Sequence, residues 1–352
     1  MKIAVLTSGG DAPGMNAALR TISVVGVGRG HEVLGIRHGY AGLLRGDVVK
    51  LDGAAVDGIT RMGGTILGSS RCLEMMNEAG QAAAHAKLLE MGVEALAVIG
   101  GNGSLTGAHA LARRGGVTVV GLPASIDNDI GHTGLAIGVD TAVNTIVEAC
   151  DRIADTARAH RRVFIVEVMG RKCGFLAMRA GIAAEADAIL FGEETVEEDV
   201  LVERLRAALR KCFAAGSSKH RALIVKSEGL SMPAGRLATR LTEHLAEDAP
   251  GADLRETVLG HVVRGGNPTA LDRVIAQRLG YAAVMCAEMK ASDVMVAWEP
   301  TFAAGKRSAD PSVHVVPIAE VLEETGRMLD GTSAIVKSRI ELLSKVQDLF
   351  SI

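Results

Sequence analysis

Ala95-Leu-Ala-Val-Ile-Gly-Gly-Asn-Gly-Ser-Leu-Thr-Gly107 is the stretch around which this 352-residue chain is organised. The apolar residues 95–99 predict one buried strand, and the glycines that follow predict a tight loop. Ser104 is a suitable N-cap for the helix expected after the loop. A strand, a glycine loop and a helix N-terminus together direct backbone N–H groups at an anion. The stretch therefore indicates either a phosphate site or an unliganded turn.

Two other segments are rich in glycine. Residues 3–6 predict a strand that leads through the loop 7–14 into a helix from about Met15, which repeats the pattern of the central stretch. Residues 63–71 end in Arg71 and predict either a third phosphate contact or an ordinary surface loop. We expect further strands at 33–36, 117–122, 163–168, 188–191, 222–225 and 294–298, one strand from Thr257 toward Pro268, and helices at 80–91, 138–159, 196–212, 237–245 and 336–350. This alternation predicts parallel sheets of the α/β class.

Composition excludes several classes of protein. Hydrophobic residues make up 48% of the chain and charged residues 22%, which predicts a globular and not a disordered protein. A formal net charge of −3 argues against nucleic-acid binding. The five cysteines show no CxxC spacing, which favours free thiols over disulfides or zinc. The sequence shows neither a signal-peptide pattern nor an apolar run that spans a bilayer, so we expect a cytoplasmic protein with no membrane partner.

Asp127 and Asp129 follow the strand expected at 117–122, where α/β sheets place their chemistry. The pair indicates either an Asx-rich turn or a general base with its orienting partner.

Other polar residues fall into two sets. The first set suits a polyphosphate and consists of Gly10, Arg71, Gly101, Gly103, Ser104 and Gly107. The second set lies later in the chain and supplies cations and a carboxylate suited to a sugar phosphate: Arg162, Arg171, Glu228, Arg255, His261 and Arg264. Two phosphate sites and a carboxylate indicate phosphoryl transfer to a hydroxyl.

A dinucleotide site is the competing interpretation. Residues 101–107 also read as GxGxxxG, and a Rossmann site requires an acidic residue about 20 positions later, close to Asp127. However, Asp127 lies in an Asp-Asn-Asp cluster after a proline turn. Hydride transfer also leaves the arginine set without a role, so we rank this alternative lower.

The chain resembles the bacterial 6-phosphofructokinase family over most of its length. The resemblance rests on five motifs in the family's order, at residues 7–18, 63–71, 126–129, 166–174 and 258–266. It implies two Rossmann-like three-layer domains with mainly parallel sheets. Residues 1–138 with about 263–312 would form a larger nucleotide-binding domain. Residues 139–262 with 313–352 would form a smaller domain that binds sugar phosphate.

The resemblance also implies a reaction and roles for individual residues. ATP would phosphorylate the C1 hydroxyl of fructose 6-phosphate, a step of glycolysis, with Asp127 as the base. Ser125 stands in place of the family's usual threonine, and Asp129 and Arg171 would support the base and the transferred charge. The nucleotide set would be Gly10, Arg71, Cys72, Gly101, Asn102, Gly103, Ser104 and Gly107. The sugar-phosphate set would be Ser125, Ile126, Asp127, Arg162, Met169, Gly170, Arg171, Glu228, Arg255, His261 and Arg264. Arg162 and Arg255 match residues that act on a neighbouring subunit's site, which implies an oligomer, expected to be a homotetramer.

Three positions bear on the phosphoryl donor and its metal. Asn102 stands where the family usually has a magnesium-binding aspartate, so we expect a weak Mg²⁺ ligand and a metal held mainly by triphosphate and water. Pyrophosphate-dependent relatives usually carry an acidic residue in place of Gly103 and a lysine in place of Ala124, so this chain favours ATP. The alternatives are a pyrophosphate-dependent enzyme and a catalytically weakened paralogue that binds sugar phosphate.

Overall fold

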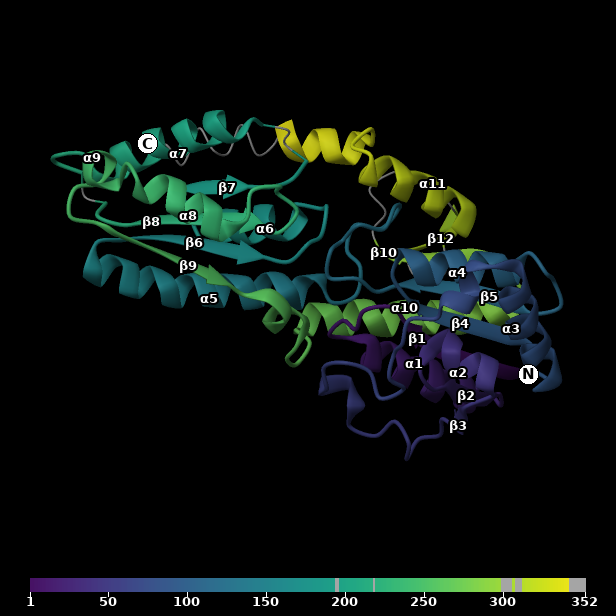
Figure 1. The fold of residues 1–352 in the computed structure, drawn as a ribbon. Helices are drawn as coiled ribbons and strands as arrows, with labels where there is room; N and C mark the ends of the chain where they lie inside the picture. The colour runs from purple at the N-terminus through teal and green to yellow at the C-terminus, as the bar shows by residue number, and fades with distance from the viewer. Residues whose placement is uncertain (194–195, 218, 299–305, 308–311, 342–352) are drawn as a thin grey trace. The chain divides into compact units, whose positions relative to one another are not determined.

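The computed structural model describes residues 1–193, 196–217, 219–298, 306–307 and 312–341. The chain divides into two compact units (Figure 1), and each consists of a largely or wholly parallel β-sheet with helices packed on it. The first unit holds residues 1–141 and 264–328. The second holds residues 142–263 and the segment from 329 onward. The predicted α/β fold with mainly parallel sheets is therefore confirmed.

The first unit is built on an eight-stranded sheet. The strand order is β11 (Lys306–Arg307), β12 (Val313–Pro317), β10 (Val294–Trp298), β5 (Thr118–Pro123), β4 (Ala95–Gly100), β1 (Lys2–Ser8), β2 (Glu32–Ile36) and β3 (Val48–Lys50). The five strands from β10 to β2 are parallel, whereas β12 and the edge strands β3 and β11 pair antiparallel. All residues of β4 are buried, as expected for a parallel strand covered on both faces.

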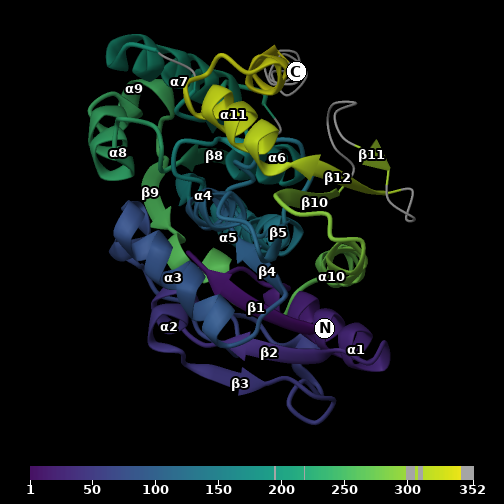
Figure 2. The ribbon, with the colours of Figure 1, turned by 90° about the vertical axis from the view of Figure 1, so that its right-hand side faces the viewer.

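Helices cover both faces of this sheet (Figure 2). Helices α1 (Met15–Gly28) and α10 (Ala270–Glu288) pack against each other on one face. On the other face lie α2 (Gly39–Arg45), α3 (Glu78–Glu90) and α4 (Asn102–Ala112). The chain crosses from β1 to β2 through α1 in one direction along the sheet, and from β4 to β5 through α4 in the opposite direction. Because both crossovers are right-handed, α1 and α4 must lie on opposite faces.

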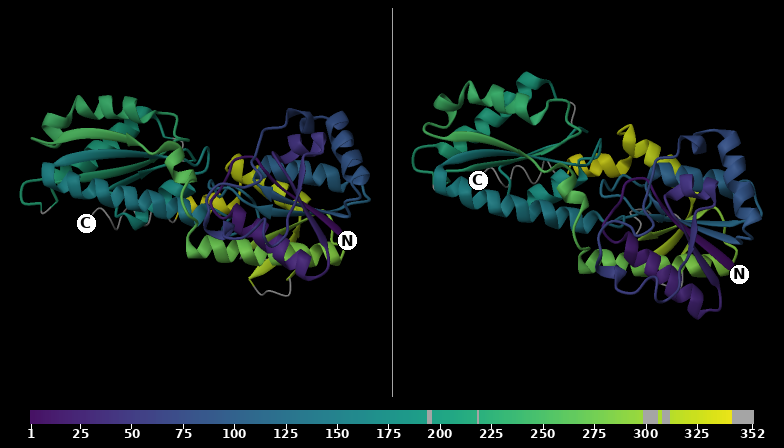
Figure 3. Two further views of the ribbon diagram at one scale, coloured as in Figure 1. Left: turned by 90° about the horizontal axis from the view of Figure 1, so that it is seen from below. Right: turned by 60° about the horizontal axis from the view of Figure 1, so that its bottom comes forward.

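The second unit contains a fully parallel sheet in the order β7 (Ala188–Leu190), β8 (Ala222–Ser227), β6 (Arg162–Val168) and β9 (Asp253–Val258). Helices α7 (Glu198–Phe213), α8 (Ala234–Thr242) and α9 (Leu245–Asp248) bury their apolar sides with β6 and β8 in one core. Helix α5 (Val139–His160) runs along the other face (Figure 3), and α6 (Phe175–Ala183) packs on Ile189 of β7.

The start of α5 is fixed by a buried carboxylate of α10. Asp272 accepts hydrogen bonds from the backbone N–H groups of Gly138 (2.9 Å) and Thr141 (2.8 Å), and from the Thr141 hydroxyl (2.5 Å). It therefore caps the orphan donors of the helix along which the chain leaves the first unit. Burial raises the pKa of the Asp272 carboxyl.

Most predicted elements are present, with corrections. Ser104 is the third residue of α4, whose N-cap is Gly101, so the predicted serine cap is wrong. Residues 313–328 belong to the first unit, because β12 pairs with β10, and not to the smaller domain in which the sequence analysis placed them. Strand β9 begins before Thr257 and ends at Val258. The sequence pattern did not predict β3, β12, α6, α10 or α11 (Ile318–Leu329). Residues 334–341 are helical, and the rest of the helix expected at 336–350 lies outside the described residues.

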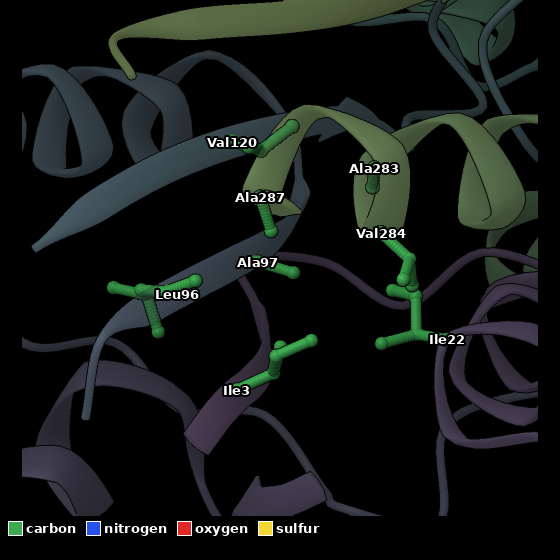
Figure 4. Close-up of a pocket in the computed structure, with 9 residues that line it drawn as sticks. Ile3, Ile22, Leu96, Ala97, Val120, Ala283, Val284 and Ala287 are labelled. Carbon is green, nitrogen blue, oxygen red and sulfur yellow. The ribbon is translucent and has the colours of Figure 1, made fainter. Parts of the chain in front are cut away.

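A small gap in the first unit's core lies between β1, β4, β5, α1 and α10 (Figure 4). Its volume is about 10 Å³, and only apolar side chains such as Ile3, Ala97 and Ala283 line it. A space of this size without polar partners does not hold an ordered water, so it is a packing defect and not a ligand site. All five cysteines are free thiols, as predicted. Within the described part of the chain, every helix is too short or too polar to cross a bilayer.

Candidate active site

Three neighbouring loops begin at the same edge of the first unit's sheet. Ser8 of β1 lies in register with Gly100 of β4, and Gly100 lies in register with Pro123 of β5. Because the three strands are parallel, the loops that follow them leave the sheet side by side at its carboxyl edge. This register brings together the two glycine loops and the aspartate cluster that the sequence singled out.

The loop after β1 is shaped for close approach. Gly9 has φ +83°, which favours glycine, and the Ser69 hydroxyl donates to its carbonyl oxygen at 2.5 Å. Arg264 Nη1 donates to the Asp11 carbonyl oxygen at 3.1 Å, and a Cβ atom at Gly10 would lie 2.8 Å from that nitrogen. The structure thus places Arg264, predicted for the sugar phosphate, against the Gly10 loop.

The loop after β4 separates open glycines from packed ones. A Cβ at Gly103 would meet no atom within 4 Å, and one at Gly101 would meet none closer than 3.8 Å. A Cβ at Gly100 would lie 2.5 Å from the buried Ser104 hydroxyl, and one at Gly107 would lie 2.9 Å from the Tyr40 ring. Gly101 and Gly103 therefore leave space for a ligand, whereas Gly107 is explained by packing.

Tyr40 is a contributor that the sequence analysis left without a role. Its hydroxyl donates to the Ser104 carbonyl oxygen at 2.6 Å, and its side chain is 3% exposed. Burial raises the pKa of this phenol, which keeps it a neutral donor. Its ring packs against Gly107 of α4, and its hydroxyl holds the first turn of that helix at Ser104. The packing of Tyr40 on Gly107 is a tertiary contact that residue spacing does not signal.

The loop after β5 buries the aspartate cluster. Asp127 is 3% exposed and Asp129 is 8% exposed. The Ser125 hydroxyl donates to Asp129 Oδ1 at 3.0 Å. Asn128, between the two aspartates, has φ +51°, accepts from the Ala136 N–H and donates to the Gly134 carbonyl oxygen. The cluster is therefore held by its own loop, and Asn128 is a shaping residue that the sequence analysis did not select, although asparagine is typical of left-handed positions.

Asn102 joins the second and third loops. Its Nδ2 donates to Asp129 Oδ2 at 3.2 Å and to the Asp129 carbonyl oxygen at 3.3 Å. Its Oδ1 is buried and has no hydrogen-bond partner in the described structure. The amide therefore offers a free neutral oxygen beside a carboxylate, a donor set that suits a hard cation such as Mg²⁺. The described residues include no group of three or more His, Cys, Asp or Glu side chains placed to hold a metal, so such an ion would take most ligands from elsewhere.

The second unit holds a separate group of predicted residues. Gly170 has φ +140° and Arg171 has φ +50°, so the chain turns sharply after β6. Glu228, which follows β8, accepts the N–H groups of Arg171 (2.8 Å) and Gly170 (3.3 Å). The Met169 side chain is buried, whereas Arg171 and Glu228 are exposed. Glu228 therefore holds the turn that presents Arg171.

Other predicted residues occupy different environments. Arg162 and Arg255 meet at Asp253, at 3.6 Å and 2.8 Å respectively. Ile126 is fully buried, which leaves only its backbone for a ligand. Arg71 and His261 are exposed, and the partly buried Cys72 thiol donates to Glu74 Oε2 at 3.4 Å.

The chain is similar in sequence and fold to phosphofructokinases. A family model described as Phosphofructokinase matches residues 2–287. The chain is 48% identical to an ATP-dependent 6-phosphofructokinase of Thermotoga neapolitana over 84% of this chain and 89% of that protein. It is 44% identical to ATP-dependent 6-phosphofructokinase 1 of Thermus thermophilus over 92% of this chain and 94% of the relative. A solved phosphofructokinase from Saccharomyces cerevisiae has a TM-score of 0.84 and 31% identity; the match covers 97% of this chain but only 50% of the yeast chain.

Proposed function

Because the chain belongs to the phosphofructokinase family, we propose that it transfers the terminal phosphoryl group of ATP to the C1 hydroxyl of fructose 6-phosphate. The products are ADP and fructose 1,6-bisphosphate, so this is an ATP-dependent step of glycolysis. The observation that carries the proposal is the buried pair Asp127 and Asp129, which lies in register beside two glycine loops. A general base beside a phosphate cradle is what transfer to a hydroxyl requires.

The first unit supplies the nucleotide side of the reaction. Backbone N–H groups around Gly10, Gly101 and Gly103 bind the phosphates, and Arg71 adds one cation. The open space at Gly103 supports ATP as donor, because an acidic side chain there would repel the α-phosphate. Ala124 is buried, and its small uncharged side chain stands where pyrophosphate-dependent relatives usually carry a lysine. Cys72, Asn102 and Ser104 complete the proposed nucleotide set.

Mg²⁺ fits this chain as a partner of ATP. The ion supplies charge neutralisation between the phosphates when it is bound. In this proposal Asn102 Oδ1 would be the protein's direct ligand, and the neighbouring Asp129 carboxylate would add negative charge. Asn102 Nδ2 already donates to Asp129, so the amide oxygen is the atom that would be left for the metal.

The chemical step requires one proton transfer within the first unit. Asp127 accepts the C1 hydroxyl proton while that oxygen forms its bond to the γ-phosphorus, and the bond from phosphorus to the ADP oxygen breaks. Asp129 is held by Ser125 and Asn102, so it stays fixed while Asp127 changes its charge. Arg171 stabilises the charge on the transferred group.

The sugar phosphate is bound mainly by the second unit. Glu228 and the turn at Met169 and Gly170 contact the sugar, and His261 and Arg264 bind its phosphate. Arg162 and Arg255 reach the site of a neighbouring copy, so the active form is a homo-oligomer, proposed to be a tetramer in the cytoplasm. Both arginines contact Asp253, which holds them together at the start of β6 and on the edge strand β9.

A steady-state assay tests the proposal. The purified chain is given fructose 6-phosphate with ATP or with pyrophosphate, and formation of fructose 1,6-bisphosphate is followed. We expect turnover with ATP and Mg²⁺ and little with pyrophosphate. Turnover with pyrophosphate alone would establish the other donor class, and binding of fructose 6-phosphate without turnover would identify a non-catalytic paralogue.

A further inference from the structure

Among the described residues of the second unit, Lys226 is the largest side chain that is completely buried. Its side chain is 1% exposed, and every residue of β8 is buried. A lysine is almost never fully buried unless its charge is paired. Here Nζ lies 2.8 Å from Glu167 Oε2, and Glu167 is the residue directly opposite Lys226 in the parallel pairing of β6 with β8.

The ion pair connects three segments of the unit. Lys226 Nζ also donates to the Ser227 carbonyl oxygen at 3.0 Å, which fixes the end of β8. Glu167 Oε2 also accepts the Ala234 N–H at 3.2 Å, at the first residue of α8. The carboxylate therefore joins β6, β8 and the positive end of a helix dipole.

The residues that follow this pair are the proposed sugar-phosphate residues. Two positions beyond Glu167 the chain reaches Met169 and then Arg171, and two positions beyond Lys226 it reaches Glu228. The Glu228 N–H donates to the Val168 carbonyl oxygen at 2.8 Å, and its carboxylate accepts the Arg171 N–H. A slip of β6 against β8 would therefore move Arg171 and Glu228 relative to each other.

We propose that Glu167 and Lys226 are positioning residues of the kinase reaction. Their ion pair fixes the register of the carboxyl ends of β6 and β8. It thereby sets the positions of Glu228 and the turn at Arg171, which bind the sugar phosphate. This inference rests on the proposed function, which assigns those residues to fructose 6-phosphate. It gives a role to a buried charge that stability alone does not require, because apolar replacement of a buried pair is often neutral for stability.

The test replaces both charges at once. In the double variant Glu167→Gln with Lys226→Met, the glutamine still accepts the Ala234 N–H and no charge stays buried alone. We expect a melting temperature close to wild type and a KM for fructose 6-phosphate raised about tenfold, because sub-ångström misplacement produces losses of this order. The KM for ATP should not change. Lys226→Met alone is the second variant. It should fold, because Glu167 would still be 18% exposed to solvent and would still accept the Ala234 N–H at the start of α8.

Lys219→Met is the matched control, because Lys219 forms an ion pair with Asp187 in the same unit at 3.1 Å. It should leave both KM values unchanged. Two outcomes would overturn the inference in a wild-type protein that is an active kinase. In the first, the folded variants of the Glu167 and Lys226 pair keep the wild-type KM for fructose 6-phosphate. In the second, their KM values for fructose 6-phosphate and ATP rise equally. A wild-type protein without ATP-dependent turnover would instead refute the proposed function. Calorimetry of fructose 6-phosphate binding without ATP then gives the same comparison of variants, and unchanged affinity would also overturn the inference.

Discussion

Substituting Asn102→Asp tests whether a neutral side chain at position 102 avoids repulsion with the Asp129 carboxylate. In the native protein Asn102 Nδ2 donates to Asp129 Oδ2 at 3.2 Å. The substitution replaces this donor with a carboxylate oxygen at the same distance. At an effective dielectric constant of about 20, two unit charges 3.2 Å apart repel by about 5 kcal/mol. Rotation of the new side chain and entry of water relieve part of this repulsion, so we expect a net loss of about 2–3 kcal/mol.

The assay is thermal unfolding of the metal-free protein. For a unit of about 200 residues, this loss lowers the melting temperature by roughly 5–10 °C near pH 8. The difference from wild type should shrink toward pH 4, the ordinary pKa range of aspartic acid, where proton uptake removes the repulsion. Mn²⁺ or Mg²⁺ should restore the variant far more than the wild type, because two carboxylates form a stronger cation site than one carboxylate and an amide.

The same variant gives a kinetic readout. A magnesium titration at fixed ATP should show that Asn102→Asp needs less free Mg²⁺ and has a higher kcat/KM for ATP than wild type. Asn77→Asp is the matched control, since Asn77 is an exposed N-cap of α3 and aspartate caps equally well. If metal-free Asn102→Asp melts at the same temperature as wild type at pH 8, and divalent cations bind both proteins equally, then residue 102 does not set the charge of a cation site.

Three further outcomes are expected. Asp127→Asn should lower kcat by about 10²–10⁴, the usual contribution of a general base, while calorimetry shows unchanged binding of fructose 6-phosphate; a variant with more than half of the wild-type kcat would contradict this role. Arg162→Ala and Arg255→Ala should each raise the KM for fructose 6-phosphate, and hybrids with Asp127→Asn subunits should regain activity; a fully active monomer would exclude shared sites. Hydrogen bonds from Arg29 lower the pKa of Glu288 to about 2, so the stability that this pair contributes is complete above the unfolded-state pKa of about 4.5 and is lost as pH falls toward 2. Glu288→Gln should therefore lower the melting temperature at pH 7 but progressively less below pH 4.5, and an equal effect at both pH values would argue against this pairing.

The motifs of the site were readable from the sequence because they depend on local chemistry. A run such as Ala95–Ile99 has few alternatives to a buried strand, and the glycines after it signal a tight loop wherever they occur. Asp127 and Asp129 were found for the same reason, since their position after a strand is a local property. Boundaries were less accurate: Ser104 is a good cap by type, but the helix already begins at Asn102.

The alternation of strands and helices, the family, and the residue types at the phosphate and carboxylate positions can all be predicted from the sequence. Which of these residues come into contact depends on how the strands pair in the folded protein. The contact of Asn102 with Asp129 spans 27 residues, and the burial of Lys226 against Glu167 spans 59 residues. Both contacts arise from the register of parallel strands, which side-chain packing across the whole sheet fixes and which periodicity along one strand does not encode. Strand β12 lies in the larger sheet because its antiparallel pairing with β10 satisfies its backbone groups, which is also a tertiary contact.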